Sequence, residues 1–133
     1  MPPHPRQCLP RGPRRCAAAT SIRLTKRSSR LKHHPGQIAF PGGKIDAGDD
    51  GPVAAALREA QEEIGLDRKF VEVLGTLPIY TTGSAFIVTP VVALVQAVHV
   101  VTANPHEVAD VFEVPLNFLM DPANHHRHAV DWA

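Results

Sequence analysis

Cysteine is nearly absent from this chain of 133 residues, and both of its cysteines, Cys8 and Cys16, lie close to the N-terminus. Two thiols in one short stretch imply neither a disulfide framework nor a catalytic thiol. Long apolar runs are also missing, which excludes a membrane-spanning helix and the apolar region of a secretory signal. We therefore expect no membrane association and a reducing, cytoplasmic location.

Aromatic residues are scarce as well, at 5% of the chain, and none interleaves with the arginines that precede Lys32. Proteins that bind single-stranded nucleic acid usually stack the bases on aromatic side chains. An inactive fragment that binds nucleic acid or another polyanion through a basic arm at residues 1–20 therefore remains only as an alternative hypothesis.

Acidic residues are missing from the beginning of the chain, where ten lysines and arginines up to Lys44 precede the first acidic residue, Asp46. The remainder carries four basic and thirteen acidic residues, so net charges of +10 and −9 combine to the total of +1. Residues 1–20 contain five prolines and no apolar periodicity, which predicts a disordered basic arm. Residues 21–133 are long enough for one domain with a core.

One helix is predicted from about Pro52 to about Ile64. Pro52 suits the first turn, and Asp49 and Asp50 can cap the free N–H groups that precede it. Gly65 suits the left-handed residue that ends a helix. Apolar side chains recur along this segment at helical spacing, so one face must be buried.

Strand-like runs are found over residues 22–25, 70–77 and 85–98, and Pro90 interrupts the last of them. A short second helix or turn is expected over residues 116–120. Strands on both sides of one well-formed helix predict an α/β fold with a mixed sheet.

The carboxylates of Glu59, Glu62 and Glu63 occupy a sector of roughly 100° of the predicted helix, beside its apolar stripe. Like charges this close repel one another unless a cation or an arginine neutralises them. A hard divalent ion such as Mg²⁺ or Mn²⁺ takes oxygen ligands of this kind. The pattern therefore indicates a metal site.

The alternative is a solvated acidic helix face on which Arg58 pairs with Glu62 at i+4. The loop before the helix favours the metal interpretation, because Gly42 and Gly43 would let the backbone approach a phosphate or a metal closely.

Two motifs carry a resemblance to the Nudix hydrolases. Residues 43–65 resemble the Nudix box through Gly43, Asp49 and the run Arg58-Glu59-Ala60-Gln61-Glu62-Glu63-Ile64-Gly65, although the box usually has glutamate at Asp49 and one residue fewer before Arg58. Just upstream, Arg23-Leu24-Thr25-Lys26-Arg27-Ser28, Lys32, Gly36 and Phe40-Pro41-Gly42-Gly43 resemble the second signature of the coenzyme A pyrophosphatases. That signature has leucine where this chain has Arg23 and arginine where it has Lys32. The resemblance covers about residues 22–120.

This resemblance implies the Nudix α/β/α sandwich and metal-dependent hydrolysis of the diphosphate bond of coenzyme A or its derivatives. The products would be 3′,5′-ADP and 4′-phosphopantetheine, and the partner a small-molecule substrate. The alternative within the family is another nucleoside diphosphate derivative. Members of this branch begin with a longer strand and continue well past Asp121, so we expect a domain that is truncated at its ends and incomplete at the C-terminus.

The resemblance also implies the roles of individual residues. The metal ligands would be Glu59 and Glu63 with Glu62 as a further ligand, and Mg²⁺ or Mn²⁺ is the expected ion. The candidates for the general base are Glu62 and Glu107, although Glu107 could equally be a charge at the start of a helix. Arg58 is expected to orient the carboxylates.

Substrate binding is assigned to cations and backbone donors of the upstream motif. Coenzyme A carries a diphosphate and a 3′-phosphate, which require such groups. The residues that the motif singles out are Arg27, Lys32, Gly42 and Gly43. His33 and His34 are interpreted as loop residues, because the acidic helix offers harder oxygen ligands.

Overall fold

The computed structural model describes residues 20–129, and these fall into two compact units. Residues 23–114 form the larger unit, and residues 20–22 and 115–129 belong to the smaller one. The arm predicted over residues 1–20, with both cysteines, lies outside the described residues apart from Thr20. Among the described residues, no helix has both the length and the apolar character that a membrane span needs.

The predicted helix is α1, Gly51–Ile64. It ends at Gly65, whose φ of 67° lies in the left-handed region that other residues enter only with strain. The predicted side-chain caps do not form. Asp50 occupies the N-cap position without a side-chain hydrogen bond, and the carboxylate of Asp49 is held instead by Arg58.

The core of the larger unit forms against the apolar face of α1. Ile64 is only 1% exposed and packs with the buried side chains of Ala60 and Leu66. Burial of one such aliphatic side chain contributes about 1.5–3 kcal/mol. The partly buried residues around this cluster are Phe70, Val71, Val101 and Val111.

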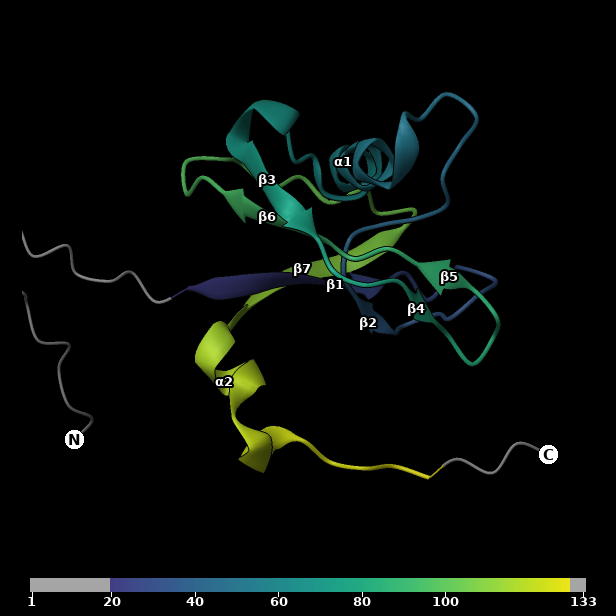
Figure 1. Cartoon of the computed structure of the whole chain (residues 1–133), viewed down its shortest axis with the longest axis vertical. Coiled ribbons are helices and arrows are strands. Elements are labelled where there is room, and N and C mark those ends of the chain that lie inside the picture. The colour runs from purple at the N-terminus through teal and green to yellow at the C-terminus, as the bar shows by residue number, and fades with distance from the viewer. Residues whose placement is uncertain (1–19, 130–133) are drawn as a thin grey trace, which may run out of the picture. The chain divides into compact units, whose positions relative to one another are not determined.

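A three-stranded sheet places β1, Ser21–Arg27, between β2, Ile38–Ala39, and β7, Val108–Pro115 (Figure 1). Strands β1 and β2 are antiparallel, with Thr25 opposite Ala39. Strand β7 was not among the predicted strands, because its sequence mixes charged and apolar residues without strict alternation.

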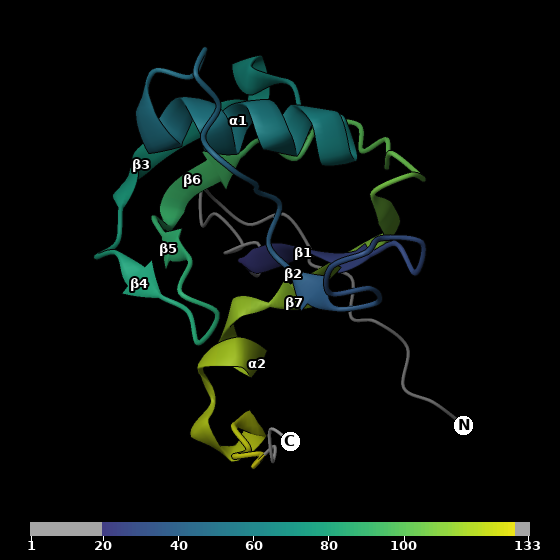
Figure 2. The same cartoon turned by 90° about the vertical axis from the view of Figure 1, so that its right-hand side faces the viewer.

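Two antiparallel pairs complete the larger unit. Strand β3, Val71–Thr76, pairs with β6, Val91–Val95, and its register shifts between Val73 and Gly75. Figures 1 and 2 both show this pair beside α1. The second pair joins β4, Tyr80–Thr81, to β5, Ile87–Val88. Pro90 thus separates two strands within the run predicted over residues 85–98.

Three short helical segments remain. A 3₁₀ turn, η1, spans Arg68–Phe70 and leads into β3. In the smaller unit, α2 spans Leu116–Met120, as predicted, and a second 3₁₀ turn, η2, spans Pro122–Asn124. The α/β class expected from the sequence is therefore confirmed.

Candidate active site

Three carboxylates meet on one side of α1. Glu59 and Glu63 come from consecutive turns of the helix, and Glu107 comes from the loop before β7. One carboxylate oxygen of each residue lies within 4.8 Å of the others. We call these three residues the carboxylate cluster. Its all-oxygen composition fits a hard divalent cation.

The loop before α1 approaches the cluster through its two glycines. The backbone N–H of Gly42 donates a hydrogen bond to Oε2 of Glu63, over 3.1 Å. Gly43 lies against Glu59 so closely that a Cβ atom at position 43 would be 2.1 Å from Oε1. The glycine pair therefore permits the close approach between this loop and the acidic face of the helix.

Glu107 reaches the cluster because hydrogen bonds tie its loop to α1 and to the residue that follows β1. The N–H of Asn104 donates to the carbonyl oxygen of Glu63 over 2.8 Å, and the N–H of Ser28 donates to the carbonyl oxygen of Glu107 over 2.9 Å. Residues 105–107 form a turn rather than a helix, so Glu107 is not a charge at a helix start. The interpretation of Glu107 as a charge at the start of a helix is therefore wrong.

The electrostatics of the cluster show a deficit of positive charge. Burial raises the pKa of Glu63 to about 7, and the negative charges of Glu59 and Glu107 add to this increase. The Gly42 N–H and the Arg27 charge oppose it. Burial likewise raises the pKa of Glu59. A bound cation would favour the ionised carboxylates and so lower the pKa values of both Glu63 and Glu59.

Arg58 connects the loop before α1 to the helix. Its guanidinium holds Asp49 through two bonds, Nε to Oδ1 over 3.0 Å and Nη2 to Oδ2 over 2.9 Å. It also donates to the carbonyl oxygen of Lys44 over 3.0 Å and to Glu59 over 3.2 Å. The hydrogen bonds from Arg58 hold the pKa of Asp49 below its usual value. Arg58 thus lies where it can orient Glu59, and Asp49 anchors it.

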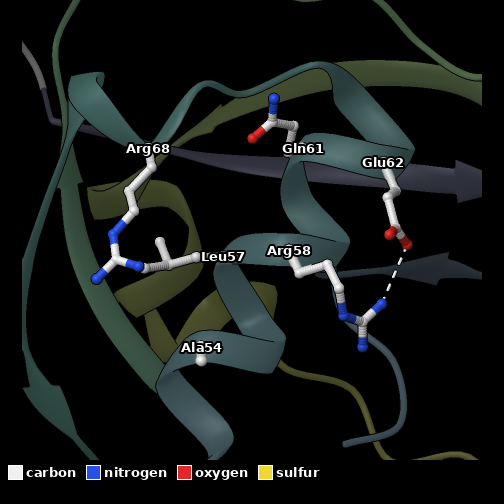
Figure 3. A pocket seen from close by; sticks show the side chains of 6 residues that line it. All are labelled: Ala54, Leu57, Arg58, Gln61, Glu62 and Arg68. Atoms are coloured by element: carbon white, nitrogen blue, oxygen red, sulfur yellow. Dashed lines mark hydrogen bonds and ion pairs between the residues drawn. The ribbon is translucent and has the colours of Figure 1, made fainter. Parts of the chain in front are cut away.

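Glu62 does not join the carboxylate cluster and instead pairs with Arg58 over 3.1 Å. Figure 3 shows these two side chains together on the outer face of α1. A surface hollow of about 450 Å³ lies there, lined by Ala54, Leu57, Arg58, Gln61, Glu62 and Arg68. Helical periodicity places Glu62 about 100° from Glu63. The place of Glu62 among the metal ligands stays a prediction, whereas Glu107 lies beside Glu59 and Glu63.

The upstream cations occupy different environments. Arg27, at the end of β1, is partly buried, and its Nε has no hydrogen-bond partner among the described residues. Lys32 is exposed in the turn that connects β1 to β2. Arg23 occupies the leucine position of the signature. Its guanidinium binds the side chains of Glu113 and His99, so this arginine connects parts of the fold.

The sequence interpretation missed Asn104, whose side-chain amide donates to Oε1 of Glu107 over 3.1 Å. The dipeptide Asn104-Pro105 is a turn signal that could have drawn attention to this loop. It could not have shown that the turn faces α1.

The α/β fold and the acidic helix that follows a Gly-Gly loop define a Nudix-type domain. The model of the NUDIX domain family matches residues 14–133, so the chain belongs to this family. A relative from Citrobacter koseri, named an uncharacterized Nudix hydrolase NudL, is 45% identical over 109 residues, which are 82% of this chain and 57% of that protein. A relative of the same name from Photorhabdus laumondii is 40% identical over 111 residues, 84% of this chain and 59% of the relative. The chain therefore spans little more than half the length of these relatives.

Solved structures show the same fold. A C. elegans Ap4A hydrolase in a binary complex superposes with a TM-score of 0.63 at 19% identity, over 79% of this chain and 76% of that one. The M. Smegmatis Nudix hydrolase RenU gives a TM-score of 0.61 at 24% identity, over 74% of this chain and 62% of that one.

Proposed function

We propose that this domain hydrolyses the diphosphate bond of coenzyme A or its derivatives to 3′,5′-ADP and 4′-phosphopantetheine, with Mg²⁺ or Mn²⁺ as cofactor. The observation that carries the proposal is the convergence of Glu59, Glu63 and Glu107 beside the Gly42-Gly43 loop. Membership of the Nudix family supports hydrolysis of a nucleoside diphosphate derivative as the class of reaction.

The carboxylate cluster would hold the metal mainly through Glu59 and Glu63. When bound, a divalent ion neutralises charge on the diphosphate oxygens and lowers the pKa of a coordinated water. Glu107 is the better of the two candidates for the general base. Its carboxylate lies beside those of Glu59 and Glu63, whereas the carboxylate of Glu62 is held by Arg58. In this role the Glu107 carboxylate accepts the proton of the attacking water.

Coenzyme A is proposed as the substrate because of the signature that precedes the Nudix box. Arg27 and Lys32 are the cations that the signature singles out, and they lie at the end of β1 and in the following turn. Arg27 carries a charge that acts on Glu63, and one donor that no described residue satisfies. Its position supports a role next to a diphosphate, and Lys32 is free to meet a more distant phosphate.

The experiment that tests this function is a product analysis. The purified chain is incubated with coenzyme A and Mg²⁺, Mn²⁺ or EDTA, and the nucleotide products are separated and identified by mass. We expect 3′,5′-ADP in equal amount to 4′-phosphopantetheine with either metal and none with EDTA. ADP-ribose, a nucleotide sugar and a dinucleoside polyphosphate are compared at equal concentration. Faster turnover of any of these would overturn the coenzyme A assignment and leave a Nudix hydrolase of another substrate.

The matched controls are Glu63→Gln, which removes one charge from the cluster, and Glu62→Gln, which removes a charge from the outer face of the same helix turn. Turnover should be lost in the first variant and largely kept in the second. Equal losses would show that the carboxylate cluster has no special role.

A further inference from the structure

Asn104 organises the turn that presents Glu107. Its carbonyl oxygen accepts hydrogen bonds from the N–H groups of Glu107, over 3.0 Å, and Val108, over 2.8 Å. Its side-chain Oδ1 accepts a bond from the N–H of His106 over 3.1 Å. These contacts shape the turn itself and would be expected of any asparagine at such a position.

Two further bonds from Asn104 extend to the carboxylate cluster. Its backbone N–H donates to the carbonyl oxygen of Glu63 over 2.8 Å, and its Nδ2 donates to Oε1 of Glu107 over 3.1 Å. The orientation of the amide follows from chemistry, because the N–H of His106 can only donate and must therefore face Oδ1. Asn104 thus links the last turn of α1 to the carboxylate of Glu107.

The carboxylate of Glu107 needs such a tether. It lies beside two other carboxylates, and Glu107 is only partly buried. Repulsion from Glu59 and Glu63 favours a rotamer of Glu107 that leaves the cluster for solvent. A neutral amide donor opposes this movement without adding a positive charge that would compete with a metal ion.

We propose that Asn104 is a positioning residue that holds the Glu107 carboxylate in the carboxylate cluster. This inference rests on the proposed function, since it assigns to Asn104 an effect on the reaction through Glu107. The amide leaves one carboxylate oxygen of Glu107 to act on a metal ion or a water.

Asn104→Asp separates positioning from a role in the turn. The variant keeps an oxygen for the N–H of His106 and all backbone bonds, but it places a carboxylate where Nδ2 met Glu107. The hydrogen bonds that shape the turn are then kept, whereas the bond to Glu107 is replaced by repulsion between two carboxylates. We expect kcat to fall about tenfold or more, with KM changed less than threefold, because the Glu107 carboxylate would no longer be held where it can accept the proton of the attacking water. A kcat within twofold of wild type would overturn the proposal.

A double-mutant cycle identifies the residue through which Asn104 acts. Asn104→Ala should lower kcat about tenfold in the wild-type background but by less than threefold in the Glu107→Ala background, because the group that it positions is then missing. Full additivity of the two effects would overturn the proposal. Asn124→Ala is the control, because it also loses a hydrogen bond donated by a side-chain amide, here to the carbonyl oxygen of Phe118 over 2.9 Å.

A binding measurement makes the test independent of turnover. Mn²⁺ affinity is measured by the loss of the free-ion EPR signal, and Asn104→Ala should weaken it about tenfold while thermal unfolding without metal changes little. Wild type that neither binds Mn²⁺ nor cleaves coenzyme A would disprove the proposed function. Wild type that does both, with Asn104→Ala equal to it in both assays, would disprove the positioning role alone.

Discussion

Gly43 and Glu59 are in contact, such that a Cβ atom at position 43 would lie 2.1 Å from Oε1 and 2.4 Å from Cδ of the Glu59 side chain. The atoms that obstruct it belong to the end of a flexible side chain rather than to backbone. A substitution at Gly43 would therefore displace the carboxylate more readily than it would unfold the loop.

We predict that Gly43→Ala lowers Mn²⁺ affinity and turnover about tenfold or more, because Glu59 must leave its place in the cluster. The free energy of unfolding should change by less than about 1 kcal/mol. Gly48→Ala, in the same loop, is the control, since its Cβ would have no neighbour within 4 Å. EPR titration and urea unfolding measure the two quantities, and a variant that binds Mn²⁺ like wild type would contradict the prediction.

Removal of the Glu63 charge should stabilise the metal-free domain at neutral and higher pH. The pKa of Glu63 is raised from 4.5 to about 7, so between these values the folded state binds more protons than the unfolded state. The free energy of unfolding therefore falls as pH rises through this window. Glutamine does not titrate, so Glu63→Gln should lack the part of this decline that comes from Glu63. Above pH 7 the free energy of unfolding of the variant should exceed that of wild type by at most about 3 kcal/mol.

Urea unfolding in EDTA at pH 5, 6, 7 and 8 measures this effect, with Glu62→Gln as the exposed control. A Glu63→Gln variant that is clearly less stable than wild type at pH 8 would mean that the glutamate contributes structural stability.

Glu59→Gln and Glu63→Gln should each lose activity and the stabilisation that a bound metal would provide. Glu59→Gln or Glu63→Gln keeps the shape of the side chain but removes a ligand charge, so turnover should fall by at least about a hundredfold. Millimolar Mg²⁺ or Mn²⁺ should raise the unfolding temperature of wild type, and the rise should shrink in Glu63→Gln. An equal rise in both proteins would place the metal elsewhere.

Arg58→Lys should weaken the connection between the loop and α1, because lysine cannot make the two-bond contact with Asp49. We expect a lower urea midpoint at pH 7. The pKa of Asp49 is lowered by its bond to Arg58, so the lost stabilisation belongs to the ionised carboxylate. The difference from wild type should therefore shrink as pH falls below about 4. Arg68→Lys, at an exposed arginine, should show neither effect.

Lys32→Ala tests the coenzyme A assignment. Loss of one charge-assisted contact should raise KM for coenzyme A about tenfold and change KM for a nucleotide sugar much less. Lys32→Arg should be tolerated, since it restores the residue of the signature, and Lys69→Ala serves as an exposed control. Equal changes for both substrates would remove the argument for a role specific to coenzyme A.

The sequence by itself determined α1 and the acidic side of that helix. Its limits follow from local chemistry, since Pro52 fits the first turn and Gly65 adopts the left-handed conformation that ends the helix. Helical spacing was enough to place Glu59 and Glu63 on consecutive turns. The family motifs added the α/β Nudix fold, which the match to the NUDIX domain family and the superposition on a solved Nudix structure confirmed.

Only the tertiary structure decided which third carboxylate joins them. Glu62 is nearer in sequence, but Arg58 holds it on the outer face of α1. Glu107 is distant in sequence and reaches the cluster because Asn104 and Ser28 tie its loop to α1 and β1. Periodicity describes the faces of one helix, whereas the loop that covers a face is fixed by hydrogen bonds between elements far apart in the chain, and no local pattern specifies these.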